Sequence, residues 1–230
     1  MKKTLSIILS ALLALSAVSF TACGSDDSGD DVYVTVTNGS IVLAYDDIDL
    51  RDADGDNALT VNDALYLAHE ENFKGGAAAG YASEMTDYGL SLTKLWGIDN
   101  GGAYGYTVNN VGAMSLADTV KPGDHIVAYV YTDLTAWSDT FCYFDKQYVD
   151  VEKNGEFTFE LTLSANGYDE SFAPITTPVE GAVITINGIA TEYVTDSNGK
   201  VTVTITDDCV ISAASETMTL VPPICVAEVD

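Results

Sequence analysis

Basic residues are scarce in this chain of 230 residues: 9 Lys and Arg stand against 35 Asp and Glu, which gives a formal net charge of −26. A chain this acidic is repelled by phosphate backbones, so nucleic-acid binding is excluded as a function class. Anionic lipid headgroups repel the chain for the same reason. If the protein is attached to a membrane, its body should therefore face away from the lipid surface.

Histidine and cysteine are also scarce, with 2 and 4 residues, so a zinc site built from them is poorly supplied. His69 does not belong to a His-Glu-x-x-His motif, and His125 follows a Gly-Asp turn. No Gly-x-Ser-x-Gly nucleophile motif is present. We therefore expect a protein that is not an enzyme. A carbohydrate-active enzyme is the weakest alternative. Acidic residues are so numerous that the presence of a glycosidase-type carboxylate pair carries little information.

Long apolar runs are absent except near the N-terminus, where residues 4–19 follow Lys2 and Lys3. The run is short and no stop-transfer pattern follows it, which is typical of a secretory signal peptide and predicts one over residues 1–22. The next residue is Cys23, directly after small residues.

This arrangement resembles a bacterial lipoprotein signal, in which the chain is cut before the cysteine and its thiol is lipidated. The resemblance implies a lipid anchor on Cys23 and an extracytoplasmic location on the bacterial cell membrane or surface. Residues 23–31 are small and acidic and should form a disordered tether. The alternative is a signal peptide without lipidation, followed by a coincidental cysteine.

Hydrophobic alternation predicts a mainly β protein with one short helix. An Asn-Gly hairpin joins strands over 32–37 and 40–45, and a helix over 62–73 is broken by glycines at 75–80. We place a domain boundary near residue 142, which gives a small β-domain over 32–141 and a β-sandwich over 142–230. Further strands are expected at 104–108, 125–131, 148–151, 157–163, 182–186, 191–195, 200–205, 210–213 and 224–229.

An acidic loop over residues 52–63 has the spacing of a calcium-binding loop. Carboxylates at loop positions 1, 3 and 5 can converge on one hard cation, a backbone carbonyl follows at position 7, and position 12 opens the helix. The candidate ligands are Asp52, Asp54, Asp56, the Ala58 carbonyl, Thr60 and Asp63. The loop resembles those of dockerins and EF-hands, which implies bound Ca²⁺. No second copy of the loop is present, so cohesin docking is not expected. The alternative is a solvated acidic turn.

Tyrosine and tryptophan gather between residues 81 and 148. One interpretation is a Tyr-rich core and surface, and the other is an aromatic platform for a flat or sugar-like ligand. The motifs Trp96-Gly97, Gly105 to Asn110, Val120 to Ile126 and Tyr129-Val130-Tyr131 resemble the transcobalamin-like C-terminal domain family over about residues 85–135. The resemblance implies a small β-domain that faces a ligand.

The transcobalamin-like resemblance implies Tyr106 and Asn109 as matching ligand-facing positions. We add Trp96, Tyr104 and Tyr129 as candidate ligand-binding residues. The animal carriers also have a large helical domain that this chain lacks, so cobalamin or another corrinoid is one candidate ligand among several. The expected function is capture of a small molecule, a peptide or a cell-surface protein, and the alternative is a structural or adhesive module without a small-molecule pocket.

Three cysteines lie beyond Cys23. Cys209 and Cys225 fall in two strands expected near each other, so a disulfide between them is plausible outside the cytoplasm, with Cys142 left free. Other pairings stay open. Residues 178–188 and 195–201 resemble bacterial immunoglobulin-like or transthyretin-like repeats, which implies a spacer or adhesion module in the C-terminal half.

Overall fold

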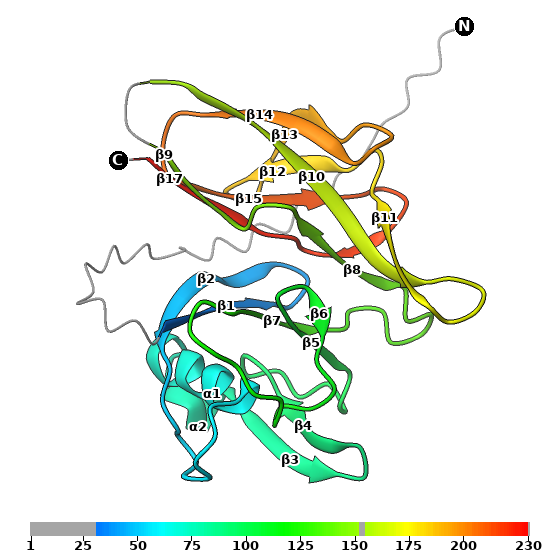
Figure 1. Cartoon of the computed structure of the whole chain (residues 1–230). Coiled ribbons are helices and arrows are strands. Elements are labelled where there is room, and N and C mark those ends of the chain that lie inside the picture. The colour runs from blue at the N-terminus through cyan, green and yellow to red at the C-terminus, as the bar shows by residue number, and fades with distance from the viewer. Residues whose placement is uncertain (1–30, 152–154, 230) are drawn as a thin grey trace, which may run out of the picture.

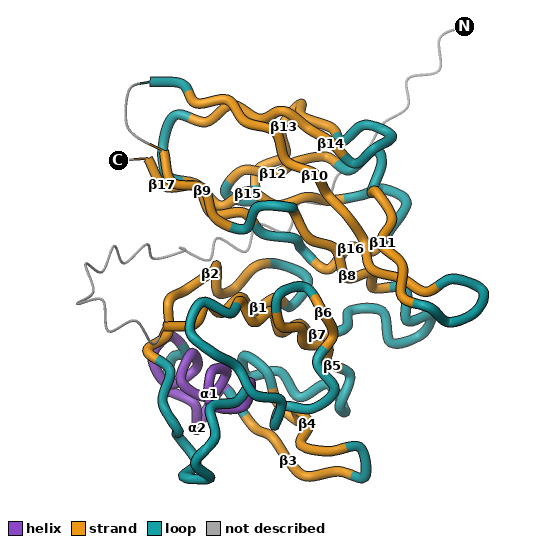
Figure 2. The backbone as a smooth tube through the Cα atoms, in the orientation of Figure 1, coloured by secondary structure: helices purple, strands orange, loops and turns teal. Residues whose placement is uncertain are grey.

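The computed structural model describes residues 31–151 and 155–229. The predicted signal peptide, Cys23 and nearly all of the acidic tether lie outside these described residues. Figure 1 shows the described chain as two packed parts, which we call the N-terminal part (31–130) and the C-terminal part (139–229). The fold is mainly β, as predicted, and its two helices both belong to the N-terminal part (Figure 2).

The N-terminal part is a five-stranded sheet in the order β2-β1-β7-β5-β6, with a separate two-stranded hairpin, β3-β4. Strand β1 runs antiparallel to β2 and parallel to β7. The elements are β1 (Asp31–Thr37), β2 (Ile41–Asp49), α1 (Val61–Asn72), α2 (Gly76–Gly80), β3 (Ala82–Thr86), β4 (Gly89–Lys94), β5 (Tyr104–Val108), β6 (Val111–Gly112) and β7 (His125–Val130).

Both faces of this sheet are covered. Along β1, Val32, Val34 and Val36 point into a core shared with α1, and the residues between them point the other way because side chains alternate along a strand. The other face packs against the C-terminal part. There, Ile41, Ala44 and Tyr45 of the N-terminal part contact a buried cluster formed by Val210, Ile224 and Val226.

The C-terminal part is a sandwich of two sheets. One has the order β11-β10-β8-β16, with β14 also paired to β10, and the other has the order β13-β12-β15-β17-β9. The strands are β8 (Asp139–Phe144), β9 (Tyr148–Val151), β10 (Phe157–Tyr168), β11 (Pro174–Pro178), β12 (Val183–Ile186), β13 (Ile189–Val194), β14 (Lys200–Ile205), β15 (Cys209–Ala214), β16 (Thr219–Val221) and β17 (Cys225–Val229). Their inner faces bury Phe144, Leu161, Leu163, Ile184 and Ile211 completely.

Strand β8 starts at Asp139, so the loop over 131–138 connects the two parts, close to the boundary that we place near residue 142. Two local predictions need correction. The first hairpin forms, but only Gly39 has a positive φ, so its turn is not the expected type I′. The glycines after α1 do not simply break the helix: Gly75 and Gly76 have positive φ and redirect the chain into α2.

Candidate metal centre

The acidic loop folds around the side chain of Asp52. This carboxylate accepts backbone N–H groups from Gly55 at 2.6 Å, Asn57 at 2.9 Å and Asp56 at 3.2 Å. The turn is possible because Gly55 and Asn57 both adopt positive φ, which glycine and asparagine tolerate better than other residues. The N–H groups of Asn57 and Gly55 lower the pKa of Asp52, so its carboxylate is held in the ionised form.

Helix α1 begins with a capping box. The Thr60 hydroxyl accepts the backbone N–H of Asp63 at 3.3 Å, and the Asp63 carboxylate accepts the backbone N–H of Thr60 at 2.9 Å. The other Asp63 oxygen accepts the N–H of Ala53 at 2.9 Å. Asp63 is fully buried. One carboxylate therefore joins the first turn of the helix to the beginning of the loop.

Asp52, Asp54 and Asp63 form a group that could hold a metal ion, because each offers an oxygen and these oxygens lie within 4.8 Å of one another. Calcium–oxygen distances are about 2.3–2.6 Å, so two ligands of one ion lie up to about 5 Å apart. The neighbouring cation, Arg51, is directed elsewhere and lies 3.5 Å from Asp49 and 3.9 Å from Glu71. The three carboxylates repel one another unless a cation joins them.

The remaining predicted ligands are placed differently. The Asp56 carboxylate accepts the backbone N–H of Ala58 at 2.8 Å and is not part of the group of three. The Thr60 hydroxyl donates to Asp63 at 2.6 Å, so its hydrogen stabilises the cap. No contact of the Ala58 carbonyl oxygen supports or opposes its predicted role as a ligand.

The loop is anchored on both sides by the N-terminal part. Leu59 packs against the core, and its carbonyl accepts the N–H of Val120 at 2.9 Å. Thr60 and Thr119 form an isolated antiparallel bridge. The segment at Thr119 and Val120 therefore holds the end of the loop against the N-terminal part.

Asn62 is a site residue that the sequence analysis missed. Its amide nitrogen donates to Asp54 at 3.3 Å, and its oxygen accepts the hydroxyls of Tyr81 and Ser83, both at 2.8 Å. A loop motif specifies positions that supply ligands, and position 11 is not one of them. Only the arrangement of α1 beside β3 reveals that Asn62 fixes the orientation of a candidate ligand.

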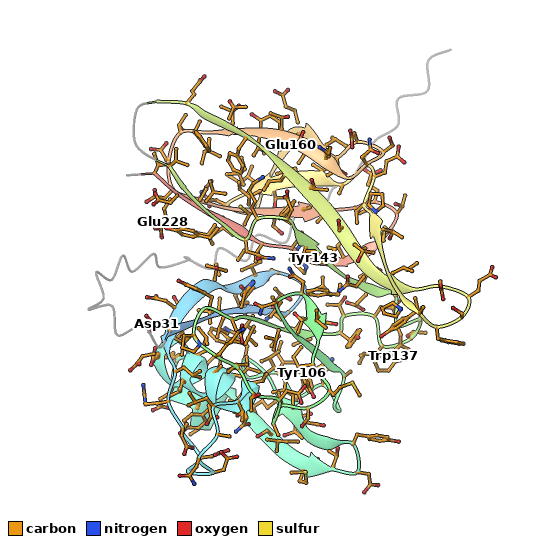
Figure 3. The ribbon with its side chains drawn as sticks, viewed as in Figure 1. Asp31, Tyr106, Trp137, Tyr143, Glu160 and Glu228 are labelled. Carbon is orange, nitrogen blue, oxygen red and sulfur yellow. The ribbon has the colours of Figure 1, made fainter. Side chains whose placement is uncertain are left out.

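The candidate aromatic residues are divided between opposite faces of one sheet. Tyr104 and Tyr106 pack against the N-terminal core, whereas Tyr129 pairs with Gly105 across β5 and β7 and therefore lies on the opposite face of the sheet. A Cβ at Gly105 would collide with the Tyr129 ring, so glycine is required there. Tyr129 stacks on Phe141 of the C-terminal part, with ring centroids 5.8 Å apart. Tyr106 is labelled in Figure 3, inside the N-terminal part.

Trp96 and Asn109 also have structural partners. The Trp96 ring packs edge-on against Phe73 at 5.4 Å, and its backbone N–H donates to His69 Nε2 at 3.0 Å. Asn109 donates to Asp124 at 2.8 Å and accepts the N–H of His125 at 2.9 Å. The five aromatic and amide candidates are thus divided between a core, a turn and the junction between the two parts.

The predicted Cys209–Cys225 disulfide is wrong: both cysteines, and Cys142, are buried free thiols. The strand register explains why. Cys209 lies opposite Ala227 and Cys225 opposite Ile211, so the two cysteines are diagonal neighbours on β15 and β17. Diagonal positions are about 7–8 Å apart, beyond the separation of about 4.4–6.8 Å between Cα atoms that a disulfide tolerates.

Comparison with known proteins adds no relative: no family model, no curated protein and no solved structure matches the chain. Within residues 31–151 and 155–229, no helix is long and apolar enough to cross a membrane. The function must therefore be argued from the site itself.

Proposed function

We propose that the loop over residues 52–63 binds one Ca²⁺ and that this ion stabilises the N-terminal part. The observation that carries the proposal is the approach of Asp52, Asp54 and Asp63 oxygens to within 4.8 Å of one another. All three donors are hard oxygens, which suit Ca²⁺ better than a soft transition metal. Backbone N–H groups already hold Asp52 and Asp63 in place, so the ion would meet a partly preformed site.

We further propose that the chain is a lipid-anchored, non-enzymatic module outside the cytoplasm and that it acts through its surface. Support comes from the division of the aromatic candidates between opposite faces of one sheet, which removes the basis for a small-molecule platform. Large apolar side chains are instead exposed on hairpins and loops, among them Tyr88 at 92% and Phe172 at 86%. With the small-molecule platform unsupported, the structural or adhesive alternative is the better supported function, and these side chains are candidate contacts with a cell-surface protein.

Thermal unfolding tests the calcium proposal. At a calcium concentration 100 times the dissociation constant, binding to the folded state alone adds about 2.7 kcal/mol, which raises the midpoint of a chain this size by roughly 5–10 °C. Asp52→Asn and Asp54→Asn should each abolish most of this rise, because each removes a charged ligand.

Asp196→Asn is the matched control. Asp196 also accepts backbone N–H groups within a turn, from Asn198 at 2.8 Å and Lys200 at 2.9 Å, but it lies outside the group of three carboxylates. This variant should keep the full calcium response. A midpoint that is the same in calcium and in chelator would reject the metal assignment.

Calorimetric titration with cyanocobalamin separates surface binding from capture of a small molecule. We expect no saturable heat, because Tyr106 and Asn109 do not share a ligand-facing surface with Tyr129. Micromolar or tighter binding would restore small-molecule capture as the leading function.

A further inference from the structure

A small cavity lies where the two parts meet. The N-terminal part contributes Asn110 and His125 to its lining, and the C-terminal part contributes Phe141, Cys142, Tyr143 and Ile224. Its volume is about 10 Å³, which is room for about one water molecule. Figure 3 shows Tyr143 at this junction between the two parts.

Two polar atoms on the lining residues are buried without a hydrogen-bond partner: Nδ1 of His125 and Oδ1 of Asn110. The His125 side chain is only 4% exposed. A buried polar group without a partner costs free energy, so two of them on one cavity call for a physical explanation.

The hydrogen bonds of His125 indicate which nitrogen carries the proton. Nε2 lies 2.9 Å from the Thr35 hydroxyl, and that hydroxyl oxygen already accepts the backbone N–H of Tyr45 at 3.1 Å. The hydroxyl hydrogen is best used as a donor to Nε2, which leaves the proton of neutral His125 on Nδ1. A water molecule in the cavity can accept this N–H and donate to Asn110 Oδ1.

The junction around the cavity is closely packed. The Tyr45 ring stacks on Tyr33 of its own sheet at 4.4 Å and on Tyr148 of the C-terminal part at 5.9 Å, and it meets the edge of His125 at 4.7 Å. The Asn166 side chain crosses the junction and donates to the Asn110 carbonyl at 2.7 Å. A second proton on His125 would therefore be buried by both parts at once.

Within residues 31–151 and 155–229, no carboxylate forms a hydrogen bond or an ion pair with the His125 ring. The titratable groups around it are Tyr33 on β1, Tyr45 on β2, Cys142 and Tyr143 on β8, and the preceding residue, Asp124. Both Asp124 oxygens are directed elsewhere: one accepts Asn109 at 2.8 Å and the other accepts the Lys121 N–H at 3.0 Å. The segment that lines the cavity from Pro222 to Ile224 carries no titratable group.

We propose that His125 is a proton-sensitive latch between the two parts: neutral His125 lets them pack together, and protonated His125 separates them. Separation returns the imidazolium to water and exposes the faces of β2, β7 and β8 that the junction buries. The latch is independent of calcium binding, because it lies on the face of the sheet opposite to α1.

The size of the effect follows from linkage. Burial lowers the pKa of His125 to about 4, against an ordinary value of 6.5 that the exposed ring would regain. The separated form therefore binds more protons below pH 6.5, and its population rises as the pH falls toward 4. Between pH 7 and pH 5 the increase is on the order of 20-fold.

The native cysteines do not report on the opening, because Cys142, Cys209 and Cys225 all belong to the core of the sandwich. Val210 lies instead in the buried cluster that meets Ile41, Ala44 and Tyr45 at the junction, so Val210→Cys places a thiol there. The full chain carrying Val210→Cys is labelled with 4,4′-dithiodipyridine at pH 7 and pH 5, and the rate at each cysteine is read by peptide mass spectrometry with fragmentation. Rates are normalised to those of the chain unfolded in urea at the same pH. We expect labelling at position 210 to accelerate on the order of 20-fold at pH 5 while the native cysteines stay protected.

Two variants test whether His125 is responsible. In His125→Gln, made in the Val210→Cys background, the side chain cannot take up a proton, so labelling at position 210 should no longer depend on pH. Asn110→Asp supplies a carboxylate acceptor for the imidazolium at a position with φ of 66°, which aspartate tolerates, so it should also suppress the acceleration. If His125→Gln does not fold, Asn110→Asp still tests the proposal.

Three results would overturn the proposal. They are a labelling rate at position 210 that does not change with pH, equal acceleration at position 210 and at the native cysteines, and an unchanged acceleration in both variants.

Discussion

The two parts of the molecule differ in what they bury. The N-terminal part encloses Asp63, His69, Asp124 and His125, together with several threonines, whereas the buried polar residues described in the C-terminal part are Thr195 and Ser212. Buried ionisable groups respond to metal ions and protons, and aliphatic cores do not. Apart from three cysteine thiols, the ionisable groups that are buried in the described chain lie in the N-terminal part, which is where we propose the metal ion and the proton act.

The largest effect on stability is expected from a substitution in the core of the C-terminal part. Leu163 is fully buried in the sandwich, so Leu163→Ala should destabilise the chain by about 2–5 kcal/mol. The loss should be the same in calcium and in chelator when measured by urea unfolding. The exposed Thr202 on β14 is the control, and Thr202→Ala should change stability by less than about 0.5 kcal/mol. If the loss of stability in Leu163→Ala depended strongly on calcium, the core of the C-terminal part would be coupled to the metal centre, which contradicts this comparison.

Acid should act on the N-terminal part. Burial lowers the pKa of His69 to about 4, and the unfolded chain regains a value near 6.5. The unfolded state therefore binds the extra proton first, so stability is lost as the pH falls from 6.5 toward 4. His69 alone should cost about 2 kcal/mol between pH 7 and pH 5.

The check is urea unfolding at both pH values for the wild type and for His69→Gln. The variant should lose less stability on acidification than the wild type. Equal losses would mean that His69 does not titrate between its folded and unfolded states as its burial implies.

The smallest effect is expected at the helix cap. Thr60→Ala removes the hydroxyl that accepts the Asp63 N–H, which should cost about 1 kcal/mol, whereas Thr60→Ser keeps the hydroxyl and should cost much less. The measurement is urea unfolding in chelator, where the cap acts without a metal ion. Identical stabilities for the two variants would indicate that the capping box contributes little.

Local features of the fold could be predicted from the sequence. The helix was expected over 62–73 and spans Val61–Asn72, and Asp63 lies in its first turn, where position 12 of the loop was expected to open it. The predicted strand over 104–108 coincides with β5. These features depend on neighbouring residues, whose spacing directly reports periodicity and capping.

Long-range relations were not predictable in this way. Alternation places Tyr104 and Tyr106 on one face but cannot tell that Tyr129 faces the other, because that depends on the register of β5 against β7. The same limit explains the wrong disulfide, since the register of β15 against β17 decides whether Cys209 and Cys225 are opposite or diagonal. The role of His125 at the junction required the packing of both parts.

The most direct test of the central claim is a calorimetric titration of the chain with Ca²⁺, starting from protein freed of metal by a chelator. We predict one saturable site per chain, with its heat lost in Asp54→Asn and retained in Asp196→Asn. An absence of saturable binding, or binding that survives Asp54→Asn unchanged, would contradict the assignment of the metal centre to Asp52, Asp54 and Asp63.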